Sequence, residues 1–106
     1  MKINIFNCHG KNKEIINHAT PPDFYIGRPS PLGNPFVIGI DGDRDEVVRK
    51  YERWLMDKCK HNGKIWKEIG KMKKSLKEFG IVNLWCWCSP LLCHGNVIKK
   101  ILEGRI

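Results

Sequence analysis

A short segment near the C-terminus, Cys86–Gly95, concentrates the side chains of this chain that could do chemistry. It reads Cys-Trp-Cys-Ser-Pro-Leu-Leu-Cys-His-Gly and holds three of the five cysteines and one of the four histidines. Cysteine and histidine side chains bind soft metal ions, act as nucleophile and base, or line shaped pockets. Three interpretations are therefore open: a metal site, a catalytic centre, and one wall of an anion-binding pocket.

A zinc site is the first interpretation. Its candidate ligands are Cys86, Cys88, Cys93 and His94. The spacing of the cysteines lacks the two-residue gap of most structural zinc knuckles, and the adjacent Cys93 and His94 would need an unusual backbone to share one ion. We therefore predict no cofactor, and we keep zinc held by these four residues as the alternative.

Nucleophilic catalysis is the second interpretation. Cys93 lies just before a predicted helix with His94 beside it, and both features lower the pKa of a thiol and make it reactive. Cys88 is a further candidate for this role. The protein would then be a hydrolase or transferase acting on a nucleotide derivative. The sequence leaves open whether it is an enzyme, because Cys86 and Cys88 are also explained as small apolar residues that fill a strand end.

Anion binding is the third interpretation. The last predicted helix begins around residues 94–96, directly after a strand and a loop. A helix N-terminus presents backbone N–H groups and a positive dipole, and a glycine there lets a phosphate approach closely. On this hypothesis the backbone of Gly95 and Asn96 holds the anion.

A proline-rich loop, residues 28–36, is expected to form the opposite wall of such a pocket. It reads Arg-Pro-Ser-Pro-Leu-Gly-Asn-Pro-Phe, and its prolines exclude a helix and make the loop rigid. Arg28 could clamp an anion in a bidentate manner, and Asn34 could orient a base or sugar. Gly33 is a third candidate ligand-binding residue. The alternatives are a salt bridge that pins the loop for Arg28, and a turn-capping role for Asn34.

Turn residues and hydrophobic periodicity predict the elements that position these loops. Asp43 and Glu46 form a capping box that opens a helix over about 44–58. Arg44 lies in the first turn of that helix, where the dipole disfavours a cation, so it is a candidate anion ligand unless it pairs with a neighbouring aspartate. The other expected elements are strands at 2–6, 24–26 and 81–86, a helix at 65–79 capped by Gly80, and a short final helix through 97–102.

The order of these elements predicts an α/β fold. A strand followed by helices and another strand favours a parallel pair joined by a right-handed crossover. We expect residues 1–106 to form a single compact domain with a small, mainly parallel sheet of three or four strands flanked by helices. The apolar run 81–86 is typical of a central strand buried on both faces, and Trp85 and Trp87 are expected to pack against helices.

Both unusual loops leave the carboxyl ends of predicted strands, where ligands bind in open α/β sheets. The proline-rich loop follows the strand at 24–26, and the cysteine segment follows the strand at 81–86. We therefore expect the two loops to meet in one pocket at the sheet edge.

Composition and charge constrain the partners. The formal net charge is +8 and the sequence pI is about 9.4, which suits an anionic partner. Much of this charge falls on the predicted helix 65–79 and is expected to be a solvated face, so nucleic-acid binding is weakly supported. No stretch is apolar enough to span a bilayer, and residues 1–6 do not form a secretory signal, so we expect a cytoplasmic protein with reduced thiols. The sequence does not determine the oligomeric state.

Five motifs together resemble a family known as domain of unknown function 4326, found in bacteria and their phages. They are Tyr25-Ile26-Gly27-Arg28, Leu32-Gly33-Asn34-Pro35-Phe36, Asp43-Arg44 opening a helix that includes Tyr51, Cys86-Trp87-Cys88-Ser89-Pro90, and Cys93-His94-Gly95. The resemblance spans about residues 23 to 102 and implies a small compact domain, in host-cell cytoplasm if a phage encodes it. It implies no reaction. The acidic residue that the family usually carries after His-Gly is Asn96 here.

The sequence therefore predicts a pocket that binds a nucleotide or another phosphorylated or ribosylated small molecule and that could act on it. The alternatives are a zinc-stabilised module that binds protein or nucleic acid, and a phage-type sponge that sequesters a nucleotide signal without catalysis.

Overall fold

The structure, a computed structural model, describes residues 2–8, 19–28, 30–61, 63–87 and 94–105. Within these residues the chain forms a three-stranded sheet and three helices. The elements are β1 (Lys2–Asn7), β2 (Asp23–Tyr25), α2 (Arg44–His61), α3 (Gly63–Phe79), β3 (Ile81–Cys86) and α4 (His94–Leu102). This is the small α/β fold that the sequence predicts.

The sheet is parallel throughout, with the strand order β1-β3-β2. The apolar strand β3 is central, and in its register Trp85 lies opposite Phe6 on one side and Tyr25 on the other. All three strands therefore end at the same edge. That edge is where the segments after Tyr25 and after Cys86 begin.

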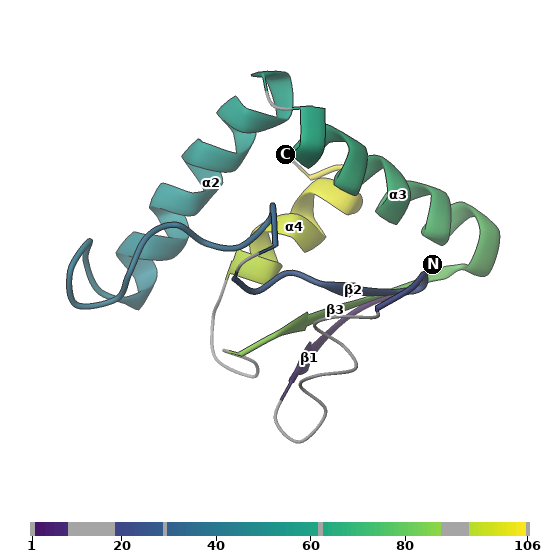
Figure 1. Ribbon diagram of the computed structural model, residues 1–106, viewed down its shortest axis with the longest axis horizontal. Helices are drawn as coiled ribbons and strands as arrows, with labels where there is room; N and C mark the ends of the chain where they lie inside the picture. Colours follow the sequence, from purple (N-terminus) through teal and green to yellow (C-terminus); the bar gives the residue numbers. More distant parts are fainter. Residues whose placement is uncertain (1, 9–18, 29, 62, 88–93, 106) are drawn as a thin grey trace.

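The helices α2, α3 and α4 lie together on one side of the sheet (Figure 1). Strand β3 points Val82, Leu84 and Cys86 toward this side, and all three are fully buried. The alternate residues of β3 are only half-buried, so the expectation that this strand is buried on both faces is wrong. The described helices α2, α3 and α4 all lie on the other side of the strand from these residues (Figure 1).

The opposite face of the sheet carries a chain of polar contacts. The Asn4 Nδ2 atom donates to Asn83 Oδ1 at 3.0 Å, and Asp23 Oδ1 accepts from both Asn83 Nδ2 and Trp85 Nε1 at 3.0 Å. The Trp85 ring lies beside Phe6, with 4.9 Å between ring centroids. Among the described helices, none packs against Trp85 as expected, because its indole lies on the face of the sheet away from α2, α3 and α4 (Figure 1).

The ends of the helices follow the expected local chemistry. Asp43 Oδ1 accepts from the Glu46 amide at 2.9 Å and Glu46 Oε1 accepts from the Asp43 amide at 3.3 Å, which confirms the capping box of α2. Gly80, with a φ of 71°, ends α3 in the left-handed conformation that glycine adopts without strain. The helix α2 continues to His61, three residues beyond its predicted end.

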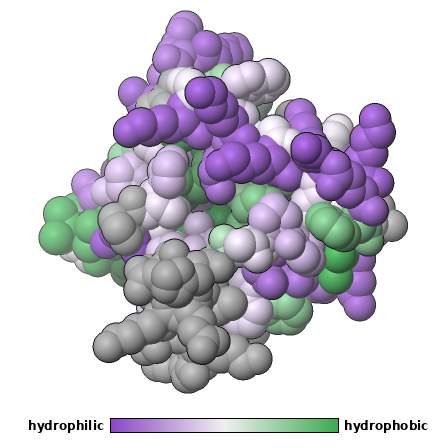
Figure 2. All heavy atoms as spheres, turned by 45° about the vertical axis from the view of Figure 1, so that its right-hand side comes forward, coloured by the Kyte–Doolittle hydropathy of each residue, from purple (hydrophilic) through white to green (hydrophobic). Residues whose placement is uncertain are grey.

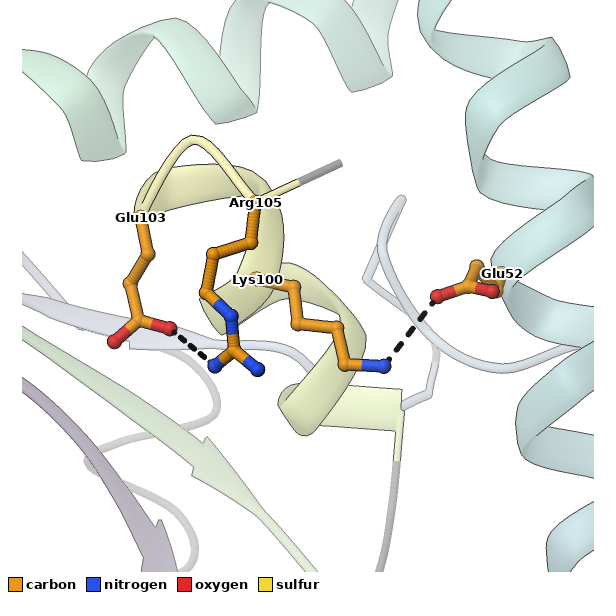
Figure 3. Close-up of polar contacts among 4 residues, drawn as sticks. All are labelled: Glu52, Lys100, Glu103 and Arg105. Atoms are coloured by element: carbon orange, nitrogen blue, oxygen red, sulfur yellow. Dashed lines mark hydrogen bonds and ion pairs between the residues drawn. The ribbon is translucent and has the colours of Figure 1, made fainter.

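The outer surface of the helical layer is strongly hydrophilic (Figure 2). Two ion pairs lie on the helices and the chain end (Figure 3). The Lys100 Nζ atom of α4 lies 3.7 Å from Glu52 Oε1 of α2, and the Arg105 Nη1 atom lies 3.2 Å from Glu103 Oε1. Exposed pairs of this kind add little stability, because solvent screens them. Among the described helices, none is long and apolar enough to cross a membrane.

Candidate functional site

A cavity of about 430 Å³ opens at the carboxyl edge of the sheet. Its lining consists of Gly27 and Arg28 after β2, Asn34, Phe36, Val37 and Ile38 in the following loop, Arg44, Val47 and Val48 at the start of α2, and Trp87 and His94 on either side of residues 88–93. This volume falls within the range of about 300–1,000 Å³ that is usual for small-molecule sites. The cavity also lies where ligands bind in open parallel sheets.

Two helices begin at this cavity. Arg44 is the first residue of α2 and His94 the first residue of α4, and both line it. The positive ends of two helix dipoles are thus directed toward the same space. Its charged lining residues, among those described, are the two arginines Arg28 and Arg44. The described part of the cavity wall therefore carries two positive side chains and no carboxylate.

Arg28 shapes the proline-rich loop. Its Nε atom donates to the Asn34 carbonyl at 2.8 Å, and its Nη2 atom donates to the Phe36 carbonyl at 3.1 Å. A guanidinium has five N–H donors, so these two bonds leave three N–H groups for other partners. These contacts differ from the salt bridge considered as an alternative for Arg28, because the guanidinium holds the loop through two backbone carbonyls. Carbonyl groups are neutral, so these bonds do not cancel the positive charge of the arginine.

Asn34 holds the same loop against α2. Its Oδ1 atom accepts from the Phe36 amide at 2.9 Å, and its Nδ2 atom donates to the Val47 carbonyl at 3.5 Å. The residue is only 9% exposed. Both ends of the carboxamide are thus engaged by backbone groups, as expected for the turn-capping alternative. Asn34 lines the cavity as part of a preformed wall.

Gly33 fits closely beneath the start of the loop. A Cβ atom at this position would lie 3.1 Å from the Arg28 Cα atom and 3.1 Å from the Gly27 carbonyl oxygen. Since these neighbours are backbone atoms, they cannot rotate away as a side chain can. The need for close packing explains a glycine at this position.

His94 is buried at the cavity wall, with 6% of its surface exposed. Its Nε2 atom lies 2.6 Å from the Ile26 carbonyl oxygen, which can only accept, so Nε2 carries the proton and Nδ1 is the acceptor of the neutral ring. Burial lowers the pKa of His94; the bond to Ile26 acts in the opposite direction, and the charge of Arg28 lowers the pKa further. The ring is therefore neutral at physiological pH.

Acid should lower the free energy of unfolding, because His94 is buried in its neutral form. Because its folded-state pKa lies below the ordinary 6.5, the unfolded chain takes up this proton first. The stability contributed by the neutral ring is complete above pH 6.5, and it falls as the pH drops through that value toward the folded-state pKa. Denaturant unfolding should show the wild type losing stability relative to His94→Gln between about pH 7.5 and 5.

The matched control is His61→Gln, which replaces an exposed histidine beside Asp57. The His61 side chain is exposed and outside the cavity lining, so this variant should differ little from the wild type in stability. A stability difference between wild type and His94→Gln that stays constant over the range would contradict a buried neutral ring at position 94.

Tyr51 connects the three walls of the cavity. Its hydroxyl donates to the Leu32 carbonyl at 2.7 Å in a buried hydrogen bond, and its ring meets the His94 ring edge-on at 5.1 Å between centroids. The residue is fully buried within α2. One side chain thus joins α2, the proline-rich loop and the start of α4.

A family model described as domain of unknown function (DUF4326) matches residues 7–104. The chain belongs to the DUF4326 family. No curated protein and no solved structure matches it. The match runs from the end of β1 past the end of α4, and so it includes every described residue that lines the cavity of this DUF4326 domain.

The described cysteines of the DUF4326 domain do not lie in the cavity wall. Cys86 packs in the hydrophobic core. Burial raises the pKa of the Cys8 thiol to about 11, and the neighbouring Cys86 adds to this effect. Burial also raises the pKa of Cys59. The Cys8 and Cys59 thiols stay protonated near neutral pH and are poor nucleophiles.

The zinc and nucleophile hypotheses depend on Cys88 and Cys93, which lie outside the described residues. Of the two other residues of the zinc hypothesis, Cys86 is fully buried and His94 has Nε2 bound to a carbonyl. Only Nδ1 of His94 would be open to a metal. Among the described residues, no group of three or more histidine, cysteine or acidic side chains could hold an ion. Zinc binding and catalysis by these cysteines stay predictions.

The cavity brings together four of the residues singled out from the sequence, namely Arg28, Asn34, Arg44 and His94. The other described candidates, Gly33, Gly95 and Asn96, are not part of its lining. Gly95 is buried and Asn96 half-buried in the first turn of α4. Direct ligand contact by these three residues is therefore not supported by the cavity's lining.

The sequence patterns did not indicate the apolar lining of the cavity. These residues are Phe36, Val37, Ile38, Val47, Val48 and Trp87. Their side chains resemble ordinary core residues, and only their position beside a strand end or a helix start could have suggested a site. The wall at Val37 is fixed by its amide, which donates to Asp41 Oδ2 at 2.8 Å.

Proposed function

We propose that the cavity binds a small anionic ligand, a nucleotide or another phosphorylated or ribosylated molecule. The observation that carries this proposal is the pairing of Arg28 and Arg44 in one cavity at the sheet edge, with no carboxylate among its described lining residues. Two guanidinium groups that line one cavity favour a ligand with negative charge.

The positions of the two arginines support a phosphate as the charged group of the ligand. Arg44 stands at the start of α2 and Arg28 follows β2, so the two charges approach the cavity from different elements. The starts of α2 and α4 add the positive ends of their dipoles. A phosphate between the arginines would meet planar donors that match its oxygens.

The apolar walls of the cavity support a ligand that carries an organic group, such as a ring, attached to its anionic group. Phe36 and Trp87 provide aromatic surface, and Val37, Ile38 and Val47 provide aliphatic surface. Inorganic phosphate alone would leave these walls in water. A base or another flat ring would cover them, which is why a nucleotide fits the lining better than a bare anion.

His94 could also contribute to a reaction. Its neutral ring lines the cavity near Arg28, and its Nδ1 atom is an acceptor that could take a proton. This arrangement would suit a hydrolase or transferase acting on the bound nucleotide derivative. Binding without turnover, as in a nucleotide-sequestering sponge, needs only the arginines and the walls.

A thermal-shift screen tests the binding. The panel pairs the ribonucleoside 5′-monophosphates and diphosphates with the corresponding nucleosides and with inorganic phosphate. At about 100 times its dissociation constant, a nucleotide should stabilise the fold by about 2.7 kcal/mol, which raises the melting temperature of a domain of this size by about 10 °C or more. Nucleosides and phosphate should act far more weakly. Equal shifts for nucleotide and inorganic phosphate, or no shift with any compound, would contradict the proposal.

Chromatography of each stabilising nucleotide after incubation then separates binding from turnover. Recovery of the intact compound at every pH from about 5 to 9 would favour the sponge. Release of a phosphate or a base from the nucleotide by the wild type, but not by His94→Gln, would favour an enzyme.

A further inference from the structure

A stripe of exposed residues runs along one side of α3. Trp66, Gly70, Lys73 and Lys77 are spaced by four, three and four residues, so they share one face of the helix. All four are exposed. The stripe extends over about 16 Å, given the rise of about 1.5 Å per residue.

Trp66 is an unusual residue for such a position. Its surface is 61% exposed, and with Cys59, Lys60, His61 and Gly63 it lines a shallow hollow at the corner between α2 and α3. A tryptophan left in water beside lysines provides a flat platform on which a nucleic-acid base can stack. The sequence alone did not suggest such a platform, because Trp66 stands next to the buried Ile65 in an amphipathic helix.

The stripe continues onto α2. Burial raises the pKa of the half-buried Cys59 thiol on α2, and the positive charge of Lys73 acts in the opposite direction, so Lys73 lies within electrostatic reach of α2. Lys60 borders the same hollow from the last turn of α2. Three lysines, Lys60, Lys73 and Lys77, therefore accompany Trp66 along one surface.

The nearby carboxylates lie close to side chains outside the stripe. Glu68 lies 3.7 Å from Lys71, and Glu78 lies 3.7 Å from Lys74. On α2, Glu52 lies 3.7 Å from Lys100, as Figure 3 shows, and Asp57 lies 3.9 Å from His61. Among the described residues, the stripe itself contains no acidic side chain. Long hydrophilic side chains are also prominent where α3 comes forward in Figure 2.

We propose that this surface binds single-stranded nucleic acid, with a base stacked on Trp66 and the backbone phosphates following Lys60, Lys73 and Lys77. Lysines supply affinity that depends on salt and not on sequence, and the aromatic ring supplies a contact that tolerates any base. The surface is distinct from the cavity, since none of its residues lines that site. The inference is therefore independent of the proposed small-molecule function.

The test measures fluorescence anisotropy of a labelled oligothymidylate of about twelve nucleotides. For the wild type, the logarithm of the binding constant should fall with the logarithm of NaCl concentration with a slope of about −2, the value expected for three phosphate contacts to a single strand. Trp66→Ala should weaken binding by about 5- to 150-fold without changing this slope. The combined change of Lys60, Lys73 and Lys77 to glutamine should bring the slope close to zero.

Matched controls distinguish binding at this surface from attraction by the overall positive charge of the protein. Phe79→Ala removes another exposed aromatic of α3, 56% exposed, that lies outside the stripe. The double variant Glu68→Gln and Lys71→Gln removes an ion pair and leaves the net charge unchanged. Both controls should bind within about twofold of the wild type. The exposed position of Trp66 means that Trp66→Ala keeps its fold, which far-ultraviolet circular dichroism verifies.

Four results would overturn the proposal. One is the absence of an anisotropy change at about 50 mM NaCl, where electrostatic binding is strong. Another is equal affinity of wild type and Trp66→Ala, which would mean attraction by charge alone. The third is competition by polyglutamate as effective as that by unlabelled oligothymidylate, which would indicate an acidic protein as the partner. Loss of binding in the double variant Arg28→Gln and Arg44→Gln would likewise overturn it, because the oligonucleotide would then enter the cavity.

Discussion

Replacing Arg28 and Arg44 together by glutamine should weaken nucleotide binding at least about 100-fold. A hydrogen bond to a charged partner contributes about 1.5–3 kcal/mol, and each arginine would provide at least one such bond to the phosphate. Titration calorimetry with the nucleotide that stabilises the wild type most gives the dissociation constants. Arg44→Gln alone isolates the charge at the helix start, since Arg28 also holds the loop through the Asn34 and Phe36 carbonyls.

The matched control for this variant is Arg49→Gln with Arg53→Gln. Both arginines are exposed on α2, away from the cavity lining, and their replacement lowers the net charge by the same amount. Binding should change less than about threefold, because neither side chain lines the cavity and solvent and salt screen exposed charges. Equal weakening by the two double variants would show that the general positive charge of the protein, and not the cavity, attracts the nucleotide.

Tyr51→Ala should lower the free energy of unfolding by about 3–5 kcal/mol, a large part of the stability of a small domain. The side chain is fully buried, contacts His94 and bonds to Leu32, so its removal opens a hole between α2, the loop and α4. Tyr51→Phe keeps the ring and removes only the hydroxyl. It should cost about 1–3 kcal/mol, because the Leu32 carbonyl loses its partner in a buried place.

Tyr25→Phe is the matched control for the hydroxyl. The Tyr25 hydroxyl accepts from Trp87 Nε1 at 2.9 Å and donates to the Arg28 carbonyl, but at an exposed place where water can replace it. Its loss should cost about 1 kcal/mol or less in urea unfolding. A Tyr51→Phe variant as stable as Tyr25→Phe would contradict the role of Tyr51 as the buried link between the cavity walls.

The fold was predictable where local chemistry determines it. The capping box of Asp43 and Glu46, the glycine cap at Gly80 and the apolar stripe of α3 each depend on residues within a few positions of one another. The parallel, central position of β3 followed from its apolar run between helices. What the pattern could not show is that the described helices α2, α3 and α4 all lie on one side of β3 (Figure 1). Its outward indole at Trp85 is satisfied by Asp23, 62 positions away in the chain.

The candidate site was predictable only where the side chain type indicated chemistry. Arg28, Arg44 and His94 stood out by type and by their place at strand and helix ends, and they line one cavity. The partners of Arg28 and His94 are backbone carbonyls of Asn34, Phe36 and Ile26, which leave no mark in the sequence. The valines and the isoleucine of the wall were indistinguishable from core residues. Their role depends on a tertiary arrangement that no local pattern encodes.

The central claim is that a nucleotide binds in the cavity between Arg28, Arg44, Trp87 and His94. The most direct measurement is a heteronuclear NMR titration of the isotope-labelled protein with the nucleotide identified by thermal shift. We predict that the largest shift changes occur at the amides of Gly27, Arg28, Ile38 and Arg44 and at the indole N–H of Trp87, while Trp66 on α3 is unaffected. Changes confined to α3, or the absence of changes at saturating nucleotide, would contradict the claim.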